Sequence, residues 1–327
     1  MADKQNLAAE PELELVVDKR RLVADDIVEL VVRRSDGGDL PPWTPGAHID
    51  LLLTGAADDP LVRQYSLCGS PHDTTSWRIA VLRERLGRGG SARVHDEITQ
   101  GTRVFVRGPR NQFTLEPARS YVFVAGGIGI TPLLPMIEAA AAAGSTWTLV
   151  YGGRTAGSMA YTDDLAEHHG GLVQLRPQDQ HGLLDLDAML AARPDDALVY
   201  CCGPGPLLDA VEQRCASLPA GTLRIERFTP RDLGDLPPAR PFEVELASSG
   251  NTIEVQADQS ILAALEEAGM PVVSSCQEGT CGTCETSVLG GDVDHRDSIL
   301  TADERAANDT MFLCVSRAAG SKLILDL

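Results

Sequence analysis

Positively charged residues are few in this sequence compared with negatively charged ones. Its 327 residues include 28 Lys and Arg but 47 Asp and Glu, which gives a formal net charge of −19. Nucleic-acid phosphates would be repelled over most of such a surface, so nucleic acid is not an expected partner. The imbalance is greatest from Phe242 onward, where 15 residues are acidic and four are basic. A docking face for a basic protein and a solvated surface kept for solubility both explain this region.

Long apolar runs are also missing. Residues 1–21 contain no apolar stretch of signal-peptide length. The longest uncharged run, Tyr121–Ile137, is interrupted by three glycines and two prolines and is short for a membrane span. We therefore expect a cytoplasmic protein with no membrane partner.

Four of the eight cysteines have the spacing of metal ligands. Three follow the pattern C-x4-C-x2-C, and the fourth lies far downstream in the strand-like segment MFLCVSRA; they are Cys276, Cys281, Cys284 and Cys314. This is the spacing of plant-type 2Fe-2S ferredoxins. Gly279 and Gly282 would let the backbone wrap the cluster and aim amide groups at its sulfurs. A zinc site usually has two C-x2-C pairs, and a disulfide framework suits a small secreted chain, so both alternatives are less favoured.

The N-terminal third has a strand pattern. Six short segments between residues 12 and 108 carry strand character, and most alternate apolar with polar residues. Six antiparallel strands of this length would close into a small barrel. Alternation in RQYSL sends Arg63 and Tyr65 to one face of a strand, where a cation and an aromatic ring suit a phosphate and a planar ring.

A glycine-rich turn follows these strands. Gly87–Ser91 reads GRGGS and leads into a predicted helix, SARVHDEI. The free amide groups and positive end of such a helix would hold a phosphate, and Arg88 could add a bidentate contact. A glycine-rich turn alone is weak evidence for a phosphate site. The presence of the Arg63 strand on the same barrel strengthens this interpretation.

From Ser120 the period changes to alternating strands and helices, which predicts a parallel sheet with helices on both faces. Ligands of such sheets bind at the carboxyl ends of the strands. The first strand ends in GGIGITP, Gly126–Pro132, where glycines would admit a pyrophosphate and Pro132 suits a first helical turn. The fourth ends in YCCGPGP, Tyr200–Pro206, which places a thiol at the same edge.

The fold class predicted from these patterns is multidomain: a six-stranded antiparallel β-barrel, an α/β parallel-sheet nucleotide domain, and an α+β ferredoxin domain of β-grasp type. The proposed boundaries are 1–112 for the barrel, 113–230 for the nucleotide domain, 231–241 for a proline-rich linker and 242–327 for the 2Fe-2S domain.

The chain resembles the phthalate dioxygenase reductase family, which includes the vanillate demethylase reductases. The resemblance rests on five motifs in this order: RQYSL, GRGGS, GGIGITP, CCGPGP and C-x4-C-x2-C…C. The resemblance implies FMN on the barrel, with FAD less favoured, then a nicotinamide nucleotide and a 2Fe-2S cluster. It implies NADH, with NADPH still open. It also implies electron delivery to a separate terminal oxygenase.

The resemblance carries roles to individual positions. Ser66 is expected near flavin N5, Cys202 beside the nicotinamide, and Phe228 over the flavin, and these three form the predicted catalytic set. The predicted cofactor-binding residues are Arg63, Tyr65, Ser66, Arg88, Gly90, Ser91, Gly127, Gly129, Thr131, Pro132, Arg154, Gly203 and Pro204. Arg154 falls where the adenosine ribose could lie.

The predicted function is therefore an NAD(P)H-dependent reductase component of an oxygenase system. A nicotinamide delivers two electrons as hydride and a 2Fe-2S cluster accepts one at a time, so a flavin between them has a clear purpose. A Rieske-type aromatic-ring dioxygenase or demethylase is the favoured partner. A haem monooxygenase partner, or an iron-sulfur redox sensor, are the alternatives.

Overall fold

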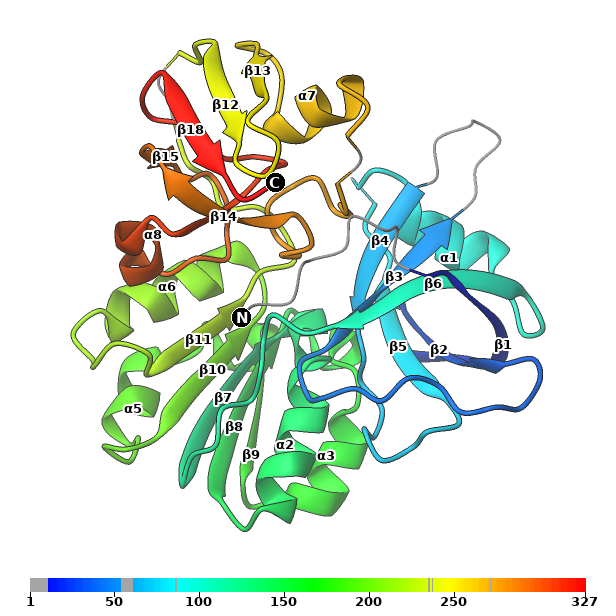
Figure 1. Ribbon diagram of the computed structural model, residues 1–327. Coiled ribbons are helices and arrows are strands. Elements are labelled where there is room, and N and C mark those ends of the chain that lie inside the picture. Colours follow the sequence, from blue (N-terminus) through cyan, green and yellow to red (C-terminus); the bar gives the residue numbers. More distant parts are fainter. Residues whose placement is uncertain (1–10, 54–60, 86, 235, 237, 271) are drawn as a thin grey trace. The chain divides into compact units, whose positions relative to one another are not determined.

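The computed structural model describes residues 11–327 apart from 54–60, 86, 235, 237 and 271. The predicted barrel domain and linker therefore fall partly outside the described residues. Contacts divide the described chain into two compact units, Pro11–Glu226 and Arg227–Leu327. The first contains both the predicted barrel and the predicted nucleotide domain (Figure 1).

The barrel forms as predicted, from six antiparallel strands in the order β4-β3-β6-β1-β2-β5. They are β1 (Leu13–Ala24), β2 (Ile27–Arg34), β3 (His48–Leu53), β4 (Leu61–Ser66), β5 (Trp77–Leu82) and β6 (Arg103–Arg110). A bridge between Leu67 and Ile79 joins the two outer strands and closes the sheet. Inward-facing apolar residues such as Leu30, Ile49 and Trp77 fill the interior. Helix α1 (Gly90–Glu97) follows the GRGGS turn.

The nucleotide sheet is five-stranded and parallel, in the order β11-β10-β7-β8-β9. Its strands are β7 (Ser120–Gly126), β8 (Thr146–Gly153), β9 (Val173–Pro177), β10 (Leu198–Cys202) and β11 (Leu223–Glu226). The helical segments between them are the 3-10 turns η1 (Gly127–Ile130) and η2 (Ala156–Ser158), and the helices α2 (Leu133–Ala142), α3 (Thr162–His169), α4 (Gln178–His181), α5 (Leu186–Ala191) and α6 (Gly205–Cys215).

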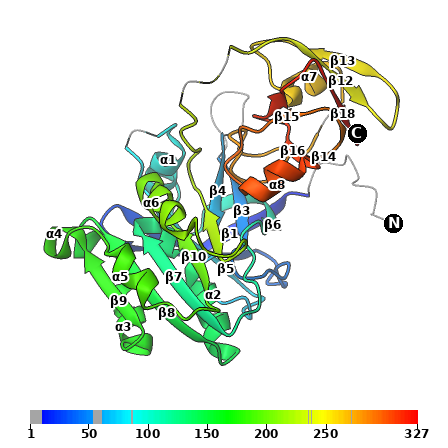
Figure 2. The same cartoon turned by 90° about the vertical axis from the view of Figure 1, so that its left-hand side faces the viewer.

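Helices cover both faces of this sheet, α2 and α3 on one side and α5 and α6 on the other (Figures 1 and 2). Strand β7 shows why: Phe123 packs into the cluster with Met136 of α2, whereas Val124 packs with Val211 of α6. A strand buried on both faces is apolar throughout, and all seven residues of β7 are buried.

The barrel and the nucleotide sheet share a hydrophobic core. Ile27 and Ala80 of the barrel belong to the same buried cluster as Ile130, Leu133 and Met136. This continuity explains why contacts place both modules in one compact unit.

A polar contact joins the same two modules. The Tyr161 hydroxyl, just before α3, donates to the buried Glu29 carboxylate of β2 at 2.9 Å. Arg21 of β1 forms a second hydrogen bond to this carboxylate at 2.6 Å. Glu29 is therefore buried with its charge compensated.

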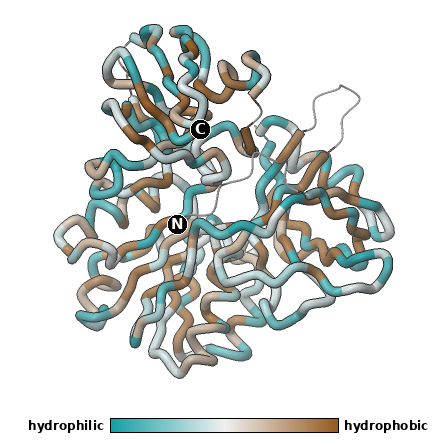
Figure 3. The backbone as a smooth tube through the Cα atoms, viewed as in Figure 1, coloured by the Kyte–Doolittle hydropathy of each residue, from teal (hydrophilic) through white to brown (hydrophobic). Residues whose placement is uncertain are grey.

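The second unit is a five-stranded mixed sheet in the order β13-β12-β18-β14-β16, with a two-stranded β15-β17 ribbon. Its elements are β12 (Phe242–Leu246), β13 (Thr252–Val255), α7 (Ile261–Glu267), β14 (Glu285–Gly290), β15 (Val293–Asp294), α8 (Ala302–Ala307), β16 (Thr310–Phe312), β17 (Arg317–Ala318) and β18 (Lys322–Leu325). Helix α7 packs on this sheet through Ile261 and Leu265, which confirms the predicted β-grasp arrangement. Apolar segments follow these strands in Figure 3.

Two local expectations differ from the structure. Cys314 lies in a turn between β16 and β17, not on a strand, because the chain must leave the sheet to bring this thiol to the other three. Helix α8 was not predicted, although Thr301 and Glu304 form the capping box that marks its start.

Candidate functional site

Arg63 and the GRGGS turn meet on the barrel, as the sequence predicts. Arg63 donates to the Arg88 carbonyl at 3.4 Å. A Cβ at Gly90 would lie 2.6 Å from Arg63 Cγ, so any other residue there would require the arginine side chain to shift from the start of α1. The Ser91 hydroxyl accepts from the Glu84 amide at 2.9 Å and fixes the turn. A cation and a helix N-terminus thus converge where the phosphate was predicted.

Tyr65 and Ser66 end strand β4. Tyr65 packs against the barrel core, and burial raises the pKa of its hydroxyl, so it stays protonated. Ser66 is buried, and its hydroxyl donates to Glu226 Oε2 at 3.4 Å. The barrel strand predicted to face the flavin therefore reaches the nucleotide sheet at Glu226.

Glu226 is a site residue that the sequence prediction missed. It ends β11 directly opposite Cys202, which ends β10, and the Cys202 thiol lies 3.8 Å from Glu226 Oε2. Ser66, Cys202 and Glu226 therefore converge at the carboxyl edge of the sheet. The available signal was an acidic residue at the end of an otherwise strand-like segment, TLRIERF.

The surroundings favour the neutral forms of the Glu226 carboxyl and the Cys202 thiol. Burial raises the pKa of Glu226 to about 8, and the hydrogen bonds from Ser66 and Cys202 lower it by less. Part of the surface of Glu226 is still accessible to solvent. Burial, and secondly the Glu226 charge, raise the pKa of Cys202 well above its ordinary value. Cys202 is therefore a thiol at neutral pH and not a nucleophilic thiolate.

The glycines of the GGIGITP loop have different tasks. Gly127 has φ +55°, and a Cβ there would meet open space, so its backbone is free to face a ligand. A Cβ at Gly129 would lie 2.2 Å from the Cys202 carbonyl oxygen, and one at Gly203 would lie 3.0 Å from Gly126 Cα. These two glycines let the loop and the end of β10 pack against each other.

Thr131 and Pro132 complete this loop. The buried Thr131 hydroxyl donates to the Ile128 carbonyl at 2.9 Å and stabilises the turn η1. Pro132 is the N-cap of α2, one residue before the helical position that the sequence suggests. Pro204 is the corresponding N-cap of α6. Helices α2 and α6 therefore both have their N-termini at this edge of the sheet.

Two predicted residues lie outside this cluster. Arg154 is exposed on the loop after β8, and its carbonyl accepts from the Asp179 amide at 3.2 Å. Phe228 is 41% exposed and belongs to the second compact unit. Their assigned roles stay predictions.

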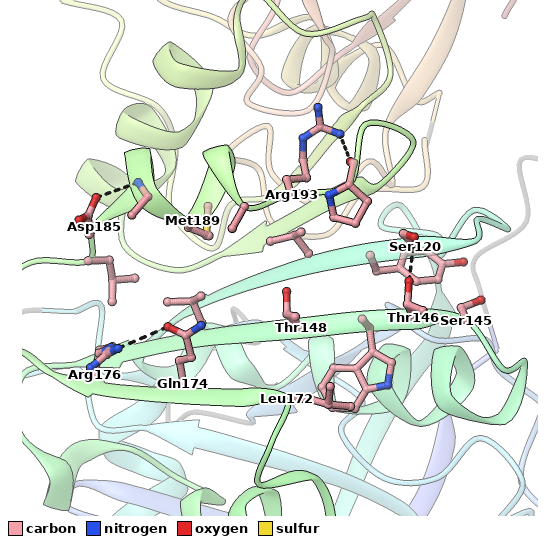
Figure 4. Close-up of a pocket in the computed structure, with 18 of the residues that line it drawn as sticks. Ser120, Ser145, Thr146, Thr148, Leu172, Gln174, Arg176, Asp185, Met189 and Arg193 are labelled. Carbon is pink, nitrogen blue, oxygen red and sulfur yellow. Dashed lines mark hydrogen bonds between the residues drawn. The ribbon is translucent and has the colours of Figure 1, made fainter.

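A cavity of about 820 Å³ lies on the β8–β9 face of the nucleotide sheet, beneath α5. Figure 4 shows Gln174 and Arg176 on the sheet side and Met189 and Arg193 on the helix side. None of the predicted site residues lines it. The cavity is therefore separate from the cluster of Ser66, Cys202 and Glu226.

The four predicted metal ligands are brought together in the second unit, and all are buried. The Cys276 thiol is within hydrogen-bonding reach of Cys281 and Cys314, and Cys314 is within reach of Cys284. In the part of the chain that the structure describes, no group of three or more His, Cys, Asp or Glu is placed to hold a lone metal ion.

The loop around these thiols fits a 2Fe-2S cluster. Gly279 and Gly282 have φ +70° and +77°, the left-handed conformation expected of them. The Glu278 amide donates to Cys276 Sγ at 3.3 Å, as predicted for amides directed at the sulfurs. Four buried thiols with amide donors are the ligand set that such a cluster requires.

No helix among the described residues is both long and apolar enough to cross a membrane.

Comparison with known proteins identifies two domains in this chain. Residues 123–213 match the oxidoreductase NAD-binding domain, and residues 244–319 match the 2Fe-2S iron-sulfur cluster binding domain. The chain is 43% identical over 308 residues to the phenoxybenzoate dioxygenase subunit beta of Ectopseudomonas oleovorans, covering 93% of this chain and 94% of the relative.

Two solved structures are similar over nearly the whole chain. Phthalate dioxygenase reductase, described as a modular structure for electron transfer from pyridine nucleotides to [2Fe-2S], is 35% identical with a TM-score of 0.69, covering 97% of this chain and 98% of that one. An intact type IV self-sufficient cytochrome P450 monooxygenase is 44% identical with a TM-score of 0.88. All of this chain is covered in that match, but it spans only 43% of the P450 chain.

Sequence, fold and site geometry agree: the chain belongs to the phthalate dioxygenase reductase family, whose members are NAD(P)H-dependent iron-sulfur reductase components of oxygenase systems.

Proposed function

We propose that this chain transfers hydride from NADH to FMN and delivers single electrons, through its 2Fe-2S cluster, to a terminal oxygenase. The observation that carries the proposal is the convergence of Ser66, Cys202 and Glu226, which joins the flavin-side strand to the nucleotide edge of the parallel sheet. FMN supplies the change from two-electron to one-electron chemistry when bound.

Each residue of this cluster has a positioning task. Ser66 presents a hydroxyl at the end of β4. This hydroxyl donates a hydrogen bond to Glu226 Oε2, which fixes the direction of the hydroxyl. Cys202 contributes a neutral, compact side chain at the end of β10, where a planar ring can approach without meeting a charge. Hydride transfer requires two atoms in near contact, so orientation is the main contribution of the protein.

Arg63 and the Gly87–Ser91 turn are the proposed phosphate site of the flavin. One arginine over one helix N-terminus suits a single phosphate, which supports FMN over FAD. In the nucleotide domain, Gly127 and the N-terminus of α2 are proposed to hold the pyrophosphate of the nucleotide. Arg154 is the proposed contact to its adenosine.

Cys202 offers a matched test. Cys202→Ala should slow flavin reduction by NADH at least tenfold in stopped-flow absorbance, with the flavin content unchanged. Cys201→Ala is the control, because Cys201 lies on the same strand but packs into the cluster on the opposite face of the sheet. Equal rates for the two variants would contradict a role of the Cys202 position in the hydride step.

For the oxygenase partner we propose the Rieske type. The separate-chain relatives include a phenoxybenzoate dioxygenase subunit and a vanillate O-demethylase oxidoreductase, which match over nearly their full length. A haem monooxygenase is the second candidate, supported by the 44% identity to a self-sufficient P450. Activity reconstituted with one purified oxygenase of each type, using oxygen consumption coupled to product, distinguishes them. We propose the cytoplasm as the compartment, since none of the eight cysteines forms a disulfide.

A further inference from the structure

Asp297 is a buried carboxylate in the second unit that neither the hydride site nor the cysteine set uses. None of its surface is exposed. Its Oδ2 accepts from the Ile299 amide at 3.0 Å and from the Leu300 amide at 2.8 Å. Arg305 lies 3.6 Å from this oxygen and also donates to the Asp297 carbonyl at 2.6 Å. A buried carboxylate persists only where such partners compensate it, so this turn is firmly held.

Helix capping does not account for this carboxylate. The next helix, α8, has its own cap, because the Thr301 hydroxyl accepts from the Glu304 amide and the Glu304 side chain accepts from the Thr301 amide. The backbone amides that donate to the Asp297 carboxylate are those of Ile299 and Leu300, which precede this capping box. Its carboxylate therefore shapes the segment that precedes the helix.

That segment, Arg296–Leu300, is bonded to both parts of the chain that supply cluster ligands. The Ser298 amide donates to the Gly279 carbonyl at 2.9 Å, in the loop between Cys276 and Cys281. The Arg296 amide donates to the Ser316 hydroxyl at 3.2 Å. Ser316 is fully buried and lies two residues after Cys314.

Close packing accompanies these two bonds. A Cβ at Gly279 would lie 3.1 Å from Asp297 Cα and 2.7 Å from Val315 Cγ2. The cluster loop, the Asp297 turn and the residue after Cys314 therefore meet with no room for one more carbon atom. A shift of the Asp297 turn must displace at least one ligand-bearing segment.

We propose that Asp297 is a positioning residue of the 2Fe-2S site. Its carboxylate folds Arg296–Leu300 into a brace that holds the loop of Cys276 and Cys281 in register with the turn of Cys314. Its action is through the backbone of this brace, not through ligation. The proposal needs only the iron-sulfur cluster, and not the flavin, the nucleotide or the identity of the oxygenase.

The second carboxylate oxygen indicates which substitution should be tolerated. Asp297 Oδ1 makes no hydrogen bond to a described residue, and the nearest ring nitrogen, His295 Nδ1, is 3.8 Å away. In Asp297→Asn the amide oxygen can still accept from Ile299 and Leu300, while its NH2 group faces the His295 ring. Asparagine keeps the brace, whereas alanine removes its acceptor.

The experiment compares Asp297→Ala with Asp297→Asn in the full chain. Iron release to a chelator is followed by the loss of cluster absorbance, and the reduced cluster is examined by electron paramagnetic resonance. Alanine should accelerate iron release about tenfold or more, because two buried amides lose their acceptor. It should also change the spectrum, and asparagine should restore the release rate to within about threefold of the unmodified protein.

Two controls separate positioning from general destabilisation. Asp303→Ala removes a carboxylate from an exposed position in the first turn of α8 and should leave iron release unchanged. Val244→Ala opens the buried core of β12 and should lower the melting temperature without changing the spectrum of the cluster. The proposal is overturned if Asp297→Ala keeps unaltered release and spectrum, if asparagine behaves like alanine, or if Val244→Ala reproduces the spectral change.

Discussion

Gly129→Ala should disrupt the hydride site by steric overlap alone. The backbone of Gly129 is not left-handed, so alanine adds no conformational strain. Its new Cβ would lie 2.2 Å from the Cys202 oxygen, 2.4 Å from the Cys202 carbonyl carbon and 2.6 Å from the Gly203 nitrogen. These distances are about 1 Å short of ordinary contact. All three atoms belong to the backbone, so no side chain can turn aside.

The loop or the end of β10 must therefore move. Overpacking a tight core costs about 1–3 kcal/mol, and an overlap with backbone belongs at the upper end of this range. The displaced segment carries Cys202, whose thiol lies 3.8 Å from Glu226. We expect the free energy of unfolding of the first unit to fall by about 3 kcal/mol in urea titration. Flavin reduction by NADH should slow at least tenfold.

Gly127→Ala is the matched control for stability in the same loop; its rate of flavin reduction is not compared, because Gly127 belongs to the proposed pyrophosphate site. Its Cβ would meet open space, and the left-handed φ of +55° adds a cost of only about 1 kcal/mol. An unfolding free energy for Gly129→Ala within about 1 kcal/mol of the unmodified protein, together with an unchanged rate, would refute the close contact between the loop and β10.

Three further predictions follow from single contacts. Because the folded protein holds the pKa of Glu226 near 8, above its value of 4.5 in the unfolded chain, stability should decline as pH rises between these values, and Glu226→Gln should flatten this decline in melting temperature. Tyr161→Phe removes the hydrogen bond to Glu29 and should lower the unfolding free energy in urea by about 1.5–3 kcal/mol; no change would mean that the bond contributes nothing net. Cys281→Ser should abolish cluster absorbance while flavin reduction by NADH survives, and loss of both would contradict the division into two units.

The parts of the site that sequence reasoning found are those encoded by local spacing. The C-x4-C-x2-C loop, the GRGGS turn and the GGIGITP loop each place their residues within one turn of chain, so the pattern carries the geometry. Arg63 was identified from strand alternation, and the structure brings it to the GRGGS turn. Even within these motifs the reason for a glycine was not readable. The absence of a side chain at Gly129 lets the end of β10 pack against the loop. Because β10 lies far along the chain, no local sequence pattern indicates this contact.

Glu226 shows why the remainder escaped. Acidic residues at strand ends are common, and only the pairing of β11 with β10 sets this one beside Cys202. The shift in its pKa comes from burial between two modules and is therefore a tertiary property. Asp297 is similar, since its importance rests on bonds that its neighbours make to Gly279 and Ser316. The turn at Cys314 was read as a strand because its apolar residues continue the pattern of β16.

The division of the chain into two compact units matches the physical demands of the proposed reaction. Hydride moves only between atoms held about 3–3.5 Å apart, so the barrel and the nucleotide sheet must keep a fixed relation. They do so through a shared core that includes Ile27, Ala80 and Met136, and through the buried bond from Tyr161 to Glu29. An electron does not require contact between donor and acceptor atoms, and the residues that hold the cluster belong to a unit with its own core. The barrel and the nucleotide sheet thus share a continuous core, and hydride transfer is the step that tolerates the least displacement. The cluster unit has its own core and an internal brace at Asp297.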